Sequence, residues 1–250
     1  MEHGQYGPPV TGDGVPDLLS GLATTRAIRR ILPDSIPERD LATILWHATR
    51  APSGSNRQPA RFLVLRDGPA ATAAKALLGE AFRAGWVEKA GAERYGEGSG
   101  ADPTSPKARQ AAAMAQFVER FEQIPVVVLA TVVPHRRPDF AMGASVYPAC
   151  QNLLLAARAL GYGGVVTMWH GYVEPELRQV LSIPDEVVIA ATIPLGRPEG
   201  RHGPVRRRPL SEVVYDDRWA EPAAWAVDPP GTRFATGPRS TTPAEPRRSG

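Results

Sequence analysis

The amino-acid sequence predicts a mixed α/β or α+β fold in which helices cover a β-sheet. One observation is the nearly continuous apolar run "PVVVLATVV" at Pro125–Val133, which is typical of a strand buried on both faces. A second is Ala144–Leu160, which is apolar almost all round and predicts a core helix that ends at Gly161. Helix-like and strand-like segments are mixed along the whole chain, which favours this class.

Apolar periodicity and turn residues place the other elements. Leu41, Ile44 and Ala48 repeat with the spacing of one buried helix face, and Ser35 with Glu38 matches a capping box ahead of them. In chain order, we expect helices at Asp17–Ile28, Ser35–Arg50, Pro69–Phe82, Lys107–Gln123 and Glu174–Leu181, strands at 61–67, 163–169 and 186–196, and a last helical turn or extended piece near residue 213.

Length and composition predict one or at most two globular domains. The chain has 250 residues, of which 42% are hydrophobic and 22% charged. Residues 1–16 and 226–250 are rich in Gly and Pro, so we expect disordered tails around a domain at 17–225. Residues 91–106 are also rich in these breakers and predict a surface loop or lid.

Several classes of protein are disfavoured by the composition. The single cysteine, Cys150, forms no intramolecular disulfide, which fits a reduced, cytoplasmic setting. The N-terminus lacks the pattern of a signal peptide, and no apolar run reaches the ~20 residues that span a bilayer. The net charge of +3 comes with two short arginine clusters rather than a basic stripe, so we expect no nucleic-acid partner.

Common catalytic motifs are absent from the sequence. There is no P-loop, no dinucleotide-binding glycine fingerprint and no nucleophile elbow. The five histidines lack metal-ligand spacing, so we expect no metal site. Cys150 lies in the middle of an apolar helix and is interpreted as a small core residue.

A set of segments spread along the chain carries a more specific signal. In order, they are "TTRAIRRILPDSIPERD", "RAPSGSNRQPARFLVLRD", "PVVVLATVV", "QNLLLAARALGYGGVVTMW" and "PLGRPEGRHGPVRRRPLSEVV". This ordered set resembles the nitroreductase-like, FMN-dependent oxidoreductase family over residues 17–215, about four-fifths of the chain. Each segment alone is a weak signal, and their order makes the set specific.

The resemblance implies an α+β fold, an α/β sandwich with a central mixed sheet covered by helices, in a homodimer with shared active sites. It also implies FMN as cofactor, with NADH or NADPH as electron donor and nitroaromatics, quinones or similar electron-poor compounds as acceptors in a ping-pong reaction. Alternatives are a specialised member of the family, such as a BluB-like flavin-fragmenting enzyme or a reductive dehalogenase, and a non-catalytic FMN-binding protein.

Arg26, Ala27 and Arg29 match the first motif of the family. The resemblance implies that Arg29 lies near the pyrimidine edge of the flavin and that Arg26 or one of its neighbours lies near the phosphate. An arginine suits both places because it is always charged and binds oxygens as a planar fork. Ala27 stands where the family usually has serine, so one hydroxyl contact is missing. Arg30 matches a variable position and is equally well interpreted as a solvated arginine.

Arg206 and Arg208 match a basic pair that holds the ribityl phosphate near the end of the family's sequence. Because three arginines are consecutive here, Arg207 is an alternative to either of them. A solvated basic loop is the competing interpretation.

The segment between the second helix and the first strand matches a motif that, in the family, reaches the flavin of the other subunit. The matching residues are Pro52, Ser53, Gly54, Asn56 and Gln58. Small residues are useful there because the backbone approaches a flat ring closely. Ala60 stands where the family usually has an aromatic residue, so we expect a less bulky wall near the substrate.

Thr167, Met168 and Trp169 match the segment whose backbone meets N5 of the flavin. We expect the backbone donor to be Met168 or Thr167, whereas Trp169 either shapes the pocket or packs in the core. His170 is a further candidate, as a proton donor next to the site. We assign no catalytic side chain, because hydride transfer at N5 needs mainly correct stacking geometry.

Overall fold

The computed structural model describes residues 15–135, 137 and 140–234. The chain divides into two compact units, with the boundary between Gly203 and Pro204. The predicted N-terminal tail lies almost wholly outside the described residues, and the predicted C-terminal tail lies outside them from residue 235 onward.

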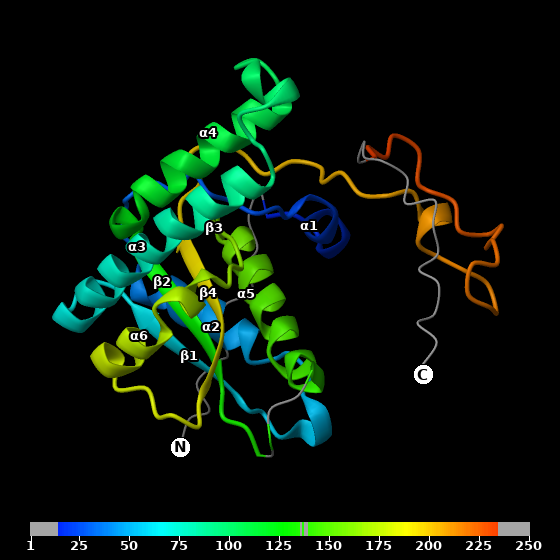
Figure 1. Ribbon diagram of the computed structural model, residues 1–250. Helices are drawn as coiled ribbons and strands as arrows, with labels where there is room; N and C mark the ends of the chain where they lie inside the picture. The colour runs from blue at the N-terminus through cyan, green and yellow to red at the C-terminus, as the bar shows by residue number, and fades with distance from the viewer. Residues whose placement is uncertain (1–14, 136, 138–139, 235–250) are drawn as a thin grey trace, which may run out of the picture. The chain divides into compact units, whose positions relative to one another are not determined.

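The first unit is built on a four-stranded sheet with the order β1-β2-β4-β3 (Figure 1). The strands are β1 Ala60–Leu65, β2 Val126–Val132, β3 Gly163–Gly164 and β4 Val188–Gly196. Every pair of neighbouring strands in the described residues is antiparallel, so the α+β class is confirmed but the prediction of a mixed sheet is wrong. Periodicity identifies a strand, but it carries no information on the direction of the neighbour.

Helices surround this sheet. The α-helices are α1 Leu18–Thr24, α2 Glu38–Ala48, α3 Pro69–Ala92, α4 Pro106–Glu119, α5 Tyr147–Ala159 and α6 Glu174–Leu181. The 3₁₀ turns are η1 Gly54–Asn56, η2 Gly98–Ala101, η3 Phe121–Gln123, η4 Phe140–Ser145, η5 Trp169–Tyr172 and, in the second unit, η6 Leu210–Glu212. No helix in the described part of the chain is long and apolar enough to cross a membrane.

Strand β2 separates two hydrophobic cores, because successive side chains of a strand point to opposite faces. Val126, Val128 and Ala130 pack with α2 and α5 in one core. Val127 and Leu129 pack with α3 and α4 in the other. All seven residues of β2 are buried, which confirms the prediction of a strand covered on both faces.

Two predicted helix starts are wrong, and proline explains both. The Ser35–Glu38 capping box does not form, because Pro37 is the N-cap and Glu38 instead pairs with Arg66 at 2.9 Å. The residue before a proline disfavours helical backbone, so this helix cannot begin at Ser35. The core helix likewise starts at Tyr147 rather than Ala144, with a proline in its first turn.

Other boundaries also differ from the predictions. Helix α1 stops at Thr24 instead of Ile28, because Thr25 has extended backbone angles; the hydroxyls of Thr24 and Thr25 donate to the carbonyls of Ser20 and Gly21 in the last turn. Helix α3 runs on to Ala92 instead of ending at Phe82. The predicted strand at 163–169 keeps a ladder only at β3 and a bridge from Thr167 to Thr192 in the same register.

The C-terminal end of α5 follows the prediction. Gly161 has φ +82°, and the amides of Gly161 and Tyr162 donate to the carbonyls of Arg158 and Ala157 at 2.9 and 2.8 Å. This is a Schellman motif, which only glycine adopts without strain. It turns the chain directly from α5 into β3.

The segment 91–106, predicted as a surface loop or lid, is largely exposed and is held by local contacts. Helix α3 occupies its first two residues, and η2 is its only helical turn within the described residues. Tyr95 is 9% exposed and packs edge-on against Trp86. Lys107 donates to the carbonyl of Arg94 at 2.7 Å and lies over the Tyr95 ring.

The second unit is held by a few contacts of its own. The amide of Leu210 donates to Asp228, and the indole of Trp225 donates to Asp216, at 3.1 and 3.0 Å. A parallel bridge joins Arg207 to Phe234. The short helical turn η6 fits the helical piece expected near residue 213.

Antiparallel pairing decides which strand ends meet. Ala60 pairs with Val132, so the loop before β1 lies at the end of the sheet where β2 finishes. Gly163 pairs with Gly196, so the start of β3 lies at the opposite end. Strands β1 and β3 are also the two edges of the sheet.

The close contact between β3 and β4 generates a prediction on stability. A Cβ at Gly164 would lie 2.3 Å from the carbonyl oxygen of Pro194, which is backbone and cannot move aside, whereas a Cβ at Gly171 meets nothing within 4 Å. Gly164→Ala should therefore lower the free energy of unfolding in urea by about 1–3 kcal/mol. Gly171→Ala is the matched control, and equal losses in the two variants would contradict this packing.

Candidate cofactor site

Arg26 and Arg29 lie in the extended segment between α1 and α2. This segment is anchored to the sheet because the amide of Ile28 donates to the carbonyl of Gly164 at 2.9 Å. Arg29 is half-buried, and burial lowers its pKa, as does the charge of Arg26, while Tyr95 acts in the opposite sense. No carboxylate in the described ranges is among the groups that act on it, so this guanidinium lacks a counter-ion there.

Two further cationic or basic side chains lie at the same end of the sheet. Arg158 is in the last turn of α5, and His202 follows β4 and contacts the carbonyl oxygen of Tyr162 through Nε2 at 3.3 Å. The Nη1 atom of Arg158 and the Nδ1 atom of His202 are buried without a hydrogen-bond partner among the described residues. Burial lowers the pKa of His202, and the charges of Arg158 and Arg26 lower it further.

These residues suit the phosphate of FMN. A buried polar nitrogen without a partner costs free energy, and guanidinium groups without carboxylates favour an anionic oxygen ligand. The chemistry of the donor set therefore fits the group that the sequence resemblance implies.

The loop Pro52–Gln58 is ordered by its own polar groups. The amide of Gln58 donates to the hydroxyl of Ser53 at 2.9 Å, and the amide of Gly54 donates to the hydroxyl of Ser145 at 3.2 Å. Ser55, Asn56 and Gln58 all have φ near +50°, a conformation that is strained for residues with a side chain. Such strain tends to gather at functional sites, and this loop is largely exposed in the single chain.

A cavity of about 580 Å³ opens beside this loop. Gly54, Ser55 and Arg57 line it from the loop, and Met142 and Ser145 line it from η4 and the residues around it. Ala60 lies between two lining residues, because it follows Pro59 in the chain and pairs with Val132. Ala60 does not itself line the cavity and packs against the core that contains α2 and α5, so an effect of position 60 on the shape of the cavity stays a prediction.

The hydrogen bonds of the segment after β3 distinguish between Thr167 and Met168 as the backbone donor to the flavin N5. The amide of Thr167 donates to the carbonyl of Thr192 at 3.0 Å, so it is not free for a ligand. The amide of Met168 has no partner among the described residues, and its side chain is 47% exposed. Met168 is thus the better candidate for the backbone donor.

Trp169 and His170 are turned into the protein. The Trp169 ring packs edge-on against Phe82 and against the backbone of Gly85, so core packing is the better interpretation of this residue. His170 is 5% exposed, with its ring nitrogens 3.1 Å from the carbonyl oxygen of Ile189 and from the hydroxyl of Thr192. Its two ring nitrogens are engaged, so it is not a proton donor to a ligand.

Arg206 and Arg208 lie in the second unit and are exposed, as is Arg207. Arg207 donates to the carbonyl of Arg206 at 2.9 Å. The role of this arginine cluster in binding phosphate stays a prediction.

The predicted parts of the site lie at diagonally opposite corners of the sheet within one chain. The Pro52–Gln58 loop precedes edge strand β1 at one end, while Arg26 and Arg29 lie beside edge strand β3 near the other. Six or seven residues of strand and three strand spacings separate such corners by roughly 25 Å. One subunit therefore does not bring the loop and these arginines around the same ligand.

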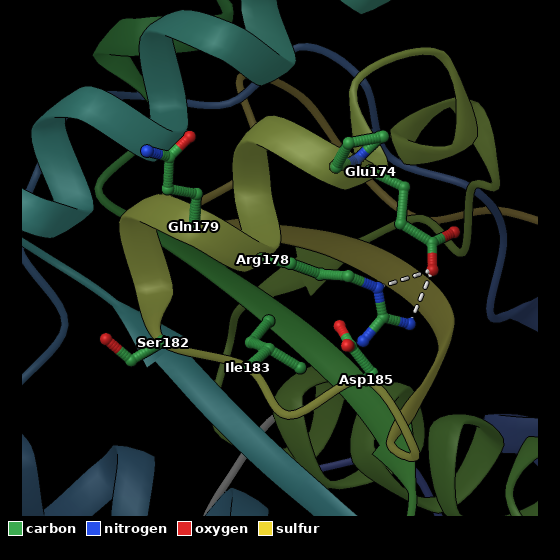
Figure 2. A pocket seen from close by; sticks show the side chains of 7 residues that line it. Glu174, Arg178, Gln179, Ser182, Ile183 and Asp185 are labelled. Carbon is green, nitrogen blue, oxygen red and sulfur yellow. Dashed lines mark hydrogen bonds and ion pairs between the residues drawn. The ribbon is translucent and has the colours of Figure 1, made fainter.

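A second hollow lies around α6 and contains none of the predicted site residues (Figure 2). Its volume is about 720 Å³. Arg178, at its centre, donates to Glu174 at 2.6 Å and to the carbonyl oxygens of Pro184 and Val187 at 2.8 and 2.7 Å. Because its guanidinium is occupied, Arg178 is interpreted as a structural link between α6 and the turn that precedes β4.

Sequence reasoning missed Arg158 and His202. The available signal for Arg158 was its position as the one charged residue in the apolar helix at Ala144–Leu160. His202 lies in the basic segment "PLGRPEGRHGPVRRRPLSEVV", in which phosphate binding was assigned to the arginines at 206–208 instead. The described residues contain no cluster of His, Cys, Asp and Glu that could hold a metal ion.

Comparison with known proteins identifies the class. A model of the Nitroreductase family matches residues 22–197, and the chain therefore belongs to the nitroreductase family. The resemblance inferred from the sequence is confirmed.

Individual relatives agree with this assignment. The chain is 33% identical over 191 residues to a protein of Thermus thermophilus named NADH dehydrogenase, a match that covers 76% of this chain and 90% of the relative. An FMN- and NADPH-dependent nitroreductase from Sphigopyxis sp. strain HMH has a TM-score of 0.64 at 18% identity, covering 82% of this chain and all 100% of the other. A BluB-like flavoprotein from Clostridium difficile 630 has a TM-score of 0.58 at 20% identity, with 81% and 100% covered. At these sequence identities, the two comparisons show that this chain has the same fold as each of the two structures.

The buried histidine generates a prediction on pH dependence. Burial lowers the pKa of His170 and outweighs the opposing effect of Glu174 and of the Ile189 carbonyl. The unfolded side chain takes up a proton near pH 6.5 and the folded one only at lower pH, so stability present above about pH 6.5 should be lost as the pH falls below it.

In His170→Gln the free energy of unfolding should therefore fall less steeply between about pH 7 and pH 5 than in the wild type. Urea unfolding at several pH values measures the two slopes. His47→Gln, at an exposed position on α2, is the control. An unchanged slope in the His170 variant would show that this residue does not titrate on unfolding.

Proposed function

We propose that the protein is an FMN-dependent oxidoreductase of the cytoplasm that takes hydride from NADH or NADPH and passes it to an electron-poor acceptor, such as a nitroaromatic or a quinone. When bound, FMN supplies the two-electron chemistry at N5. Membership of the nitroreductase family and relatives named NADH dehydrogenase and FMN- and NADPH-dependent nitroreductase support this proposal.

The observation that carries the proposal is the environment of Arg29. A half-buried guanidinium with no carboxylate acting on it within the described residues is costly unless a ligand supplies negative charge. The reduced flavin ring carries such charge at its pyrimidine edge. Arg29 would hold this edge, and the amide of Met168 would orient the ring near N5.

The chain's remaining part is positioning rather than acid–base chemistry. The described residues next to Met168 offer no free acid, since both ring nitrogens of His170 are engaged. The proton that accompanies hydride transfer then comes from water. The cavity beside the Pro52–Gln58 loop would receive the flat acceptor, with Ala60 leaving more room than an aromatic residue.

We further propose that the active form is a homodimer with two composite sites. The loop and the arginines of one chain lie at opposite corners of the sheet, so each would meet the complementary half of a second chain. Leu18, Leu19 and Leu22 of α1 are 72%, 75% and 48% exposed, an apolar helix face that a second subunit could cover. The strained, exposed loop also fits a surface that is completed by a partner.

Removal of the Arg29 guanidinium should weaken FMN binding about 10- to 100-fold, because a hydrogen bond to a charged group is lost. Quenching of flavin fluorescence measures the dissociation constant. Arg30→Ala is the matched control, because Arg30 is exposed and donates to the carbonyl of Glu199. Anaerobic addition of NADH or NADPH should bleach the bound flavin of the wild type, and an acceptor panel should restore its colour. A wild-type protein that does not bind FMN would contradict the proposed function.

Subunit complementation tests the composite site. A Cβ at Gly54 would lie 3.8 Å from the nearest atom of its own chain, so Gly54→Trp should fold and obstruct only the ligand held by the partner. Arg29→Ala should damage the other half of the site. At an FMN concentration too low to fill the Arg29→Ala sites, co-expression of the two variants should give about a quarter of wild-type turnover, because half of the dimers are mixed and each has one intact site.

The dimeric state of each variant is checked by sedimentation. Mixed dimers that form without any recovery of turnover would place the loop and Arg29 in the same site of one chain. That result would contradict the composite arrangement.

A further inference from the structure

Two buried nitrogen atoms stand out because the fold leaves them without partners. They are Nη1 of Arg158 and Nδ1 of His202, neither of which has a hydrogen-bond partner among the described residues. Buried polar atoms are nearly always paired in folded proteins. Two such atoms at one end of a sheet therefore call for a ligand that bonds to both.

Backbone geometry brings their side chains to the same place. Arg158 is in the last turn of α5, and the Schellman motif at Gly161 leads from it directly to Tyr162 and Gly163. His202 contacts the carbonyl oxygen of Tyr162 and lies 3.1 Å from the position of a Cβ on Gly163. A Cβ at 163 would clash first with Ile28, whose Cγ1 lies 2.6 Å from that position, and would also crowd His202, so glycine allows both side chains to pack on this backbone.

Arg26 approaches this place from a third element. Ile28, two residues further on, hydrogen-bonds to Gly164 and lies 2.6 Å from the Cβ position of Gly163. The charge of Arg26 acts on His202, as does that of Arg158, and no carboxylate among the described residues acts on it. The cluster is therefore basic without a counter-ion in the described chain.

We infer that Arg158 and His202, together with the exposed Arg26, form a site for a phosphate monoester, namely the terminal phosphate of FMN. This inference rests on the proposed function and adds two ligands that lie on the sheet-bearing unit of the chain. Phosphate oxygens accept several hydrogen bonds at once, and an arginine fork matches their geometry.

The length of the segment from Gly163 in β3 to Met168 fits the length of the cofactor. Met168, the candidate for the N5 contact, follows Gly163 by five residues, or about 16 Å of extended chain. A flavin ring with an extended ribityl phosphate is of comparable length. The ring would lie at Met168 and the phosphate at the start of β3, so the segment 163–168 would position both ends of the cofactor.

The ring of His202 gives the site a protonation signature. Its Nε2–H donates to the Tyr162 carbonyl, so the neutral ring would offer only a lone pair at Nδ1. Phosphate binding then takes up one proton from solvent at Nδ1, and the ring becomes an imidazolium that donates from both nitrogens. The charged groups that act on this ring within the described chain are Arg26 and Arg158, and the incoming dianion offsets both.

The experiment compares FMN with riboflavin, which has the same ring and ribityl chain but no phosphate. Arg158→Met should weaken FMN binding about tenfold or more and leave riboflavin binding within about twofold, because only the phosphate contact is lost. Arg197→Met is the matched control. Arg197 is exposed and lies over the Tyr162 ring, so its replacement removes the same charge from this end of the sheet. It should change neither constant appreciably.

Two histidine variants separate the ring nitrogens. His202→Gln keeps an amide near the Nε2 position and removes the donor at Nδ1, so it should weaken FMN but not riboflavin and abolish the part of the FMN affinity that grows as the pH falls. His202→Asn keeps an amide near the Nδ1 position and should retain more FMN affinity than His202→Gln. The reverse order, or equal losses for FMN and riboflavin, would overturn the assignment and leave a structural role, such as contact with a buried water.

The remaining outcomes distinguish this inference from the proposed function. If the wild type binds neither flavin, the proposed function is wrong. The phosphate site is then tested with inorganic phosphate alone. It is supported if phosphate raises the melting temperature of the wild type but not of Arg158→Met, and it is overturned if phosphate raises neither. A loss of NADPH binding relative to NADH with unchanged FMN binding would move the site to the donor's phosphate and overturn the assignment to FMN.

Discussion

The antiparallel pairing of β2 with β1 and β4 is the constraint on which the rest of the structure depends. Because β2 is buried on both faces, α2 and α5 must cover one side of it and α3 and α4 the other. Because its neighbours run in the opposite direction, the loop before β1 is fixed at one end of the sheet and the start of β3 at the other. The ends of the sheet at which the Pro52–Gln58 loop and the residues beside β3 lie follow from these two facts.

The same constraint explains why two subunits are needed for the proposed site. A flat sheet edge cannot bring its diagonal corners together, and the Pro52–Gln58 loop holds a strained conformation with its polar groups turned toward one another. Such a loop is preorganised before any ligand arrives, so a partner's cofactor would not have to order it. The composite site would therefore couple dimer formation to cofactor binding.

Much of the fold could be predicted from the sequence, because β2 and α5 have long apolar runs, α2 has a clear apolar periodicity and α5 ends at a glycine. Glu174–Leu181 was predicted with its observed bounds, and Gly161 ends α5 as expected. Strand direction was not predictable, since it depends on contacts between residues far apart in the chain. The motif residues could be recognised one by one in the sequence. That a nitrogen atom of Arg158 and one of His202 are buried without a hydrogen-bond partner is visible only in the folded structure, where α5, β3 and the segment after β4 pack together.

An uncompensated basic cluster also has a consequence for stability. Arg26, Arg158 and His202 gather at one end of the sheet, and no carboxylate acts on His202 within the described part of the chain. Their mutual repulsion and desolvation oppose folding in the absence of an anion. A bound phosphate removes this penalty, and by linkage the protein gains stability as RT ln(1 + [L]/Kd), about 2.7 kcal/mol at a ligand concentration 100 times Kd. The cofactor would thus act as part of the folded structure, and the cost of the empty site would favour its retention between turnovers.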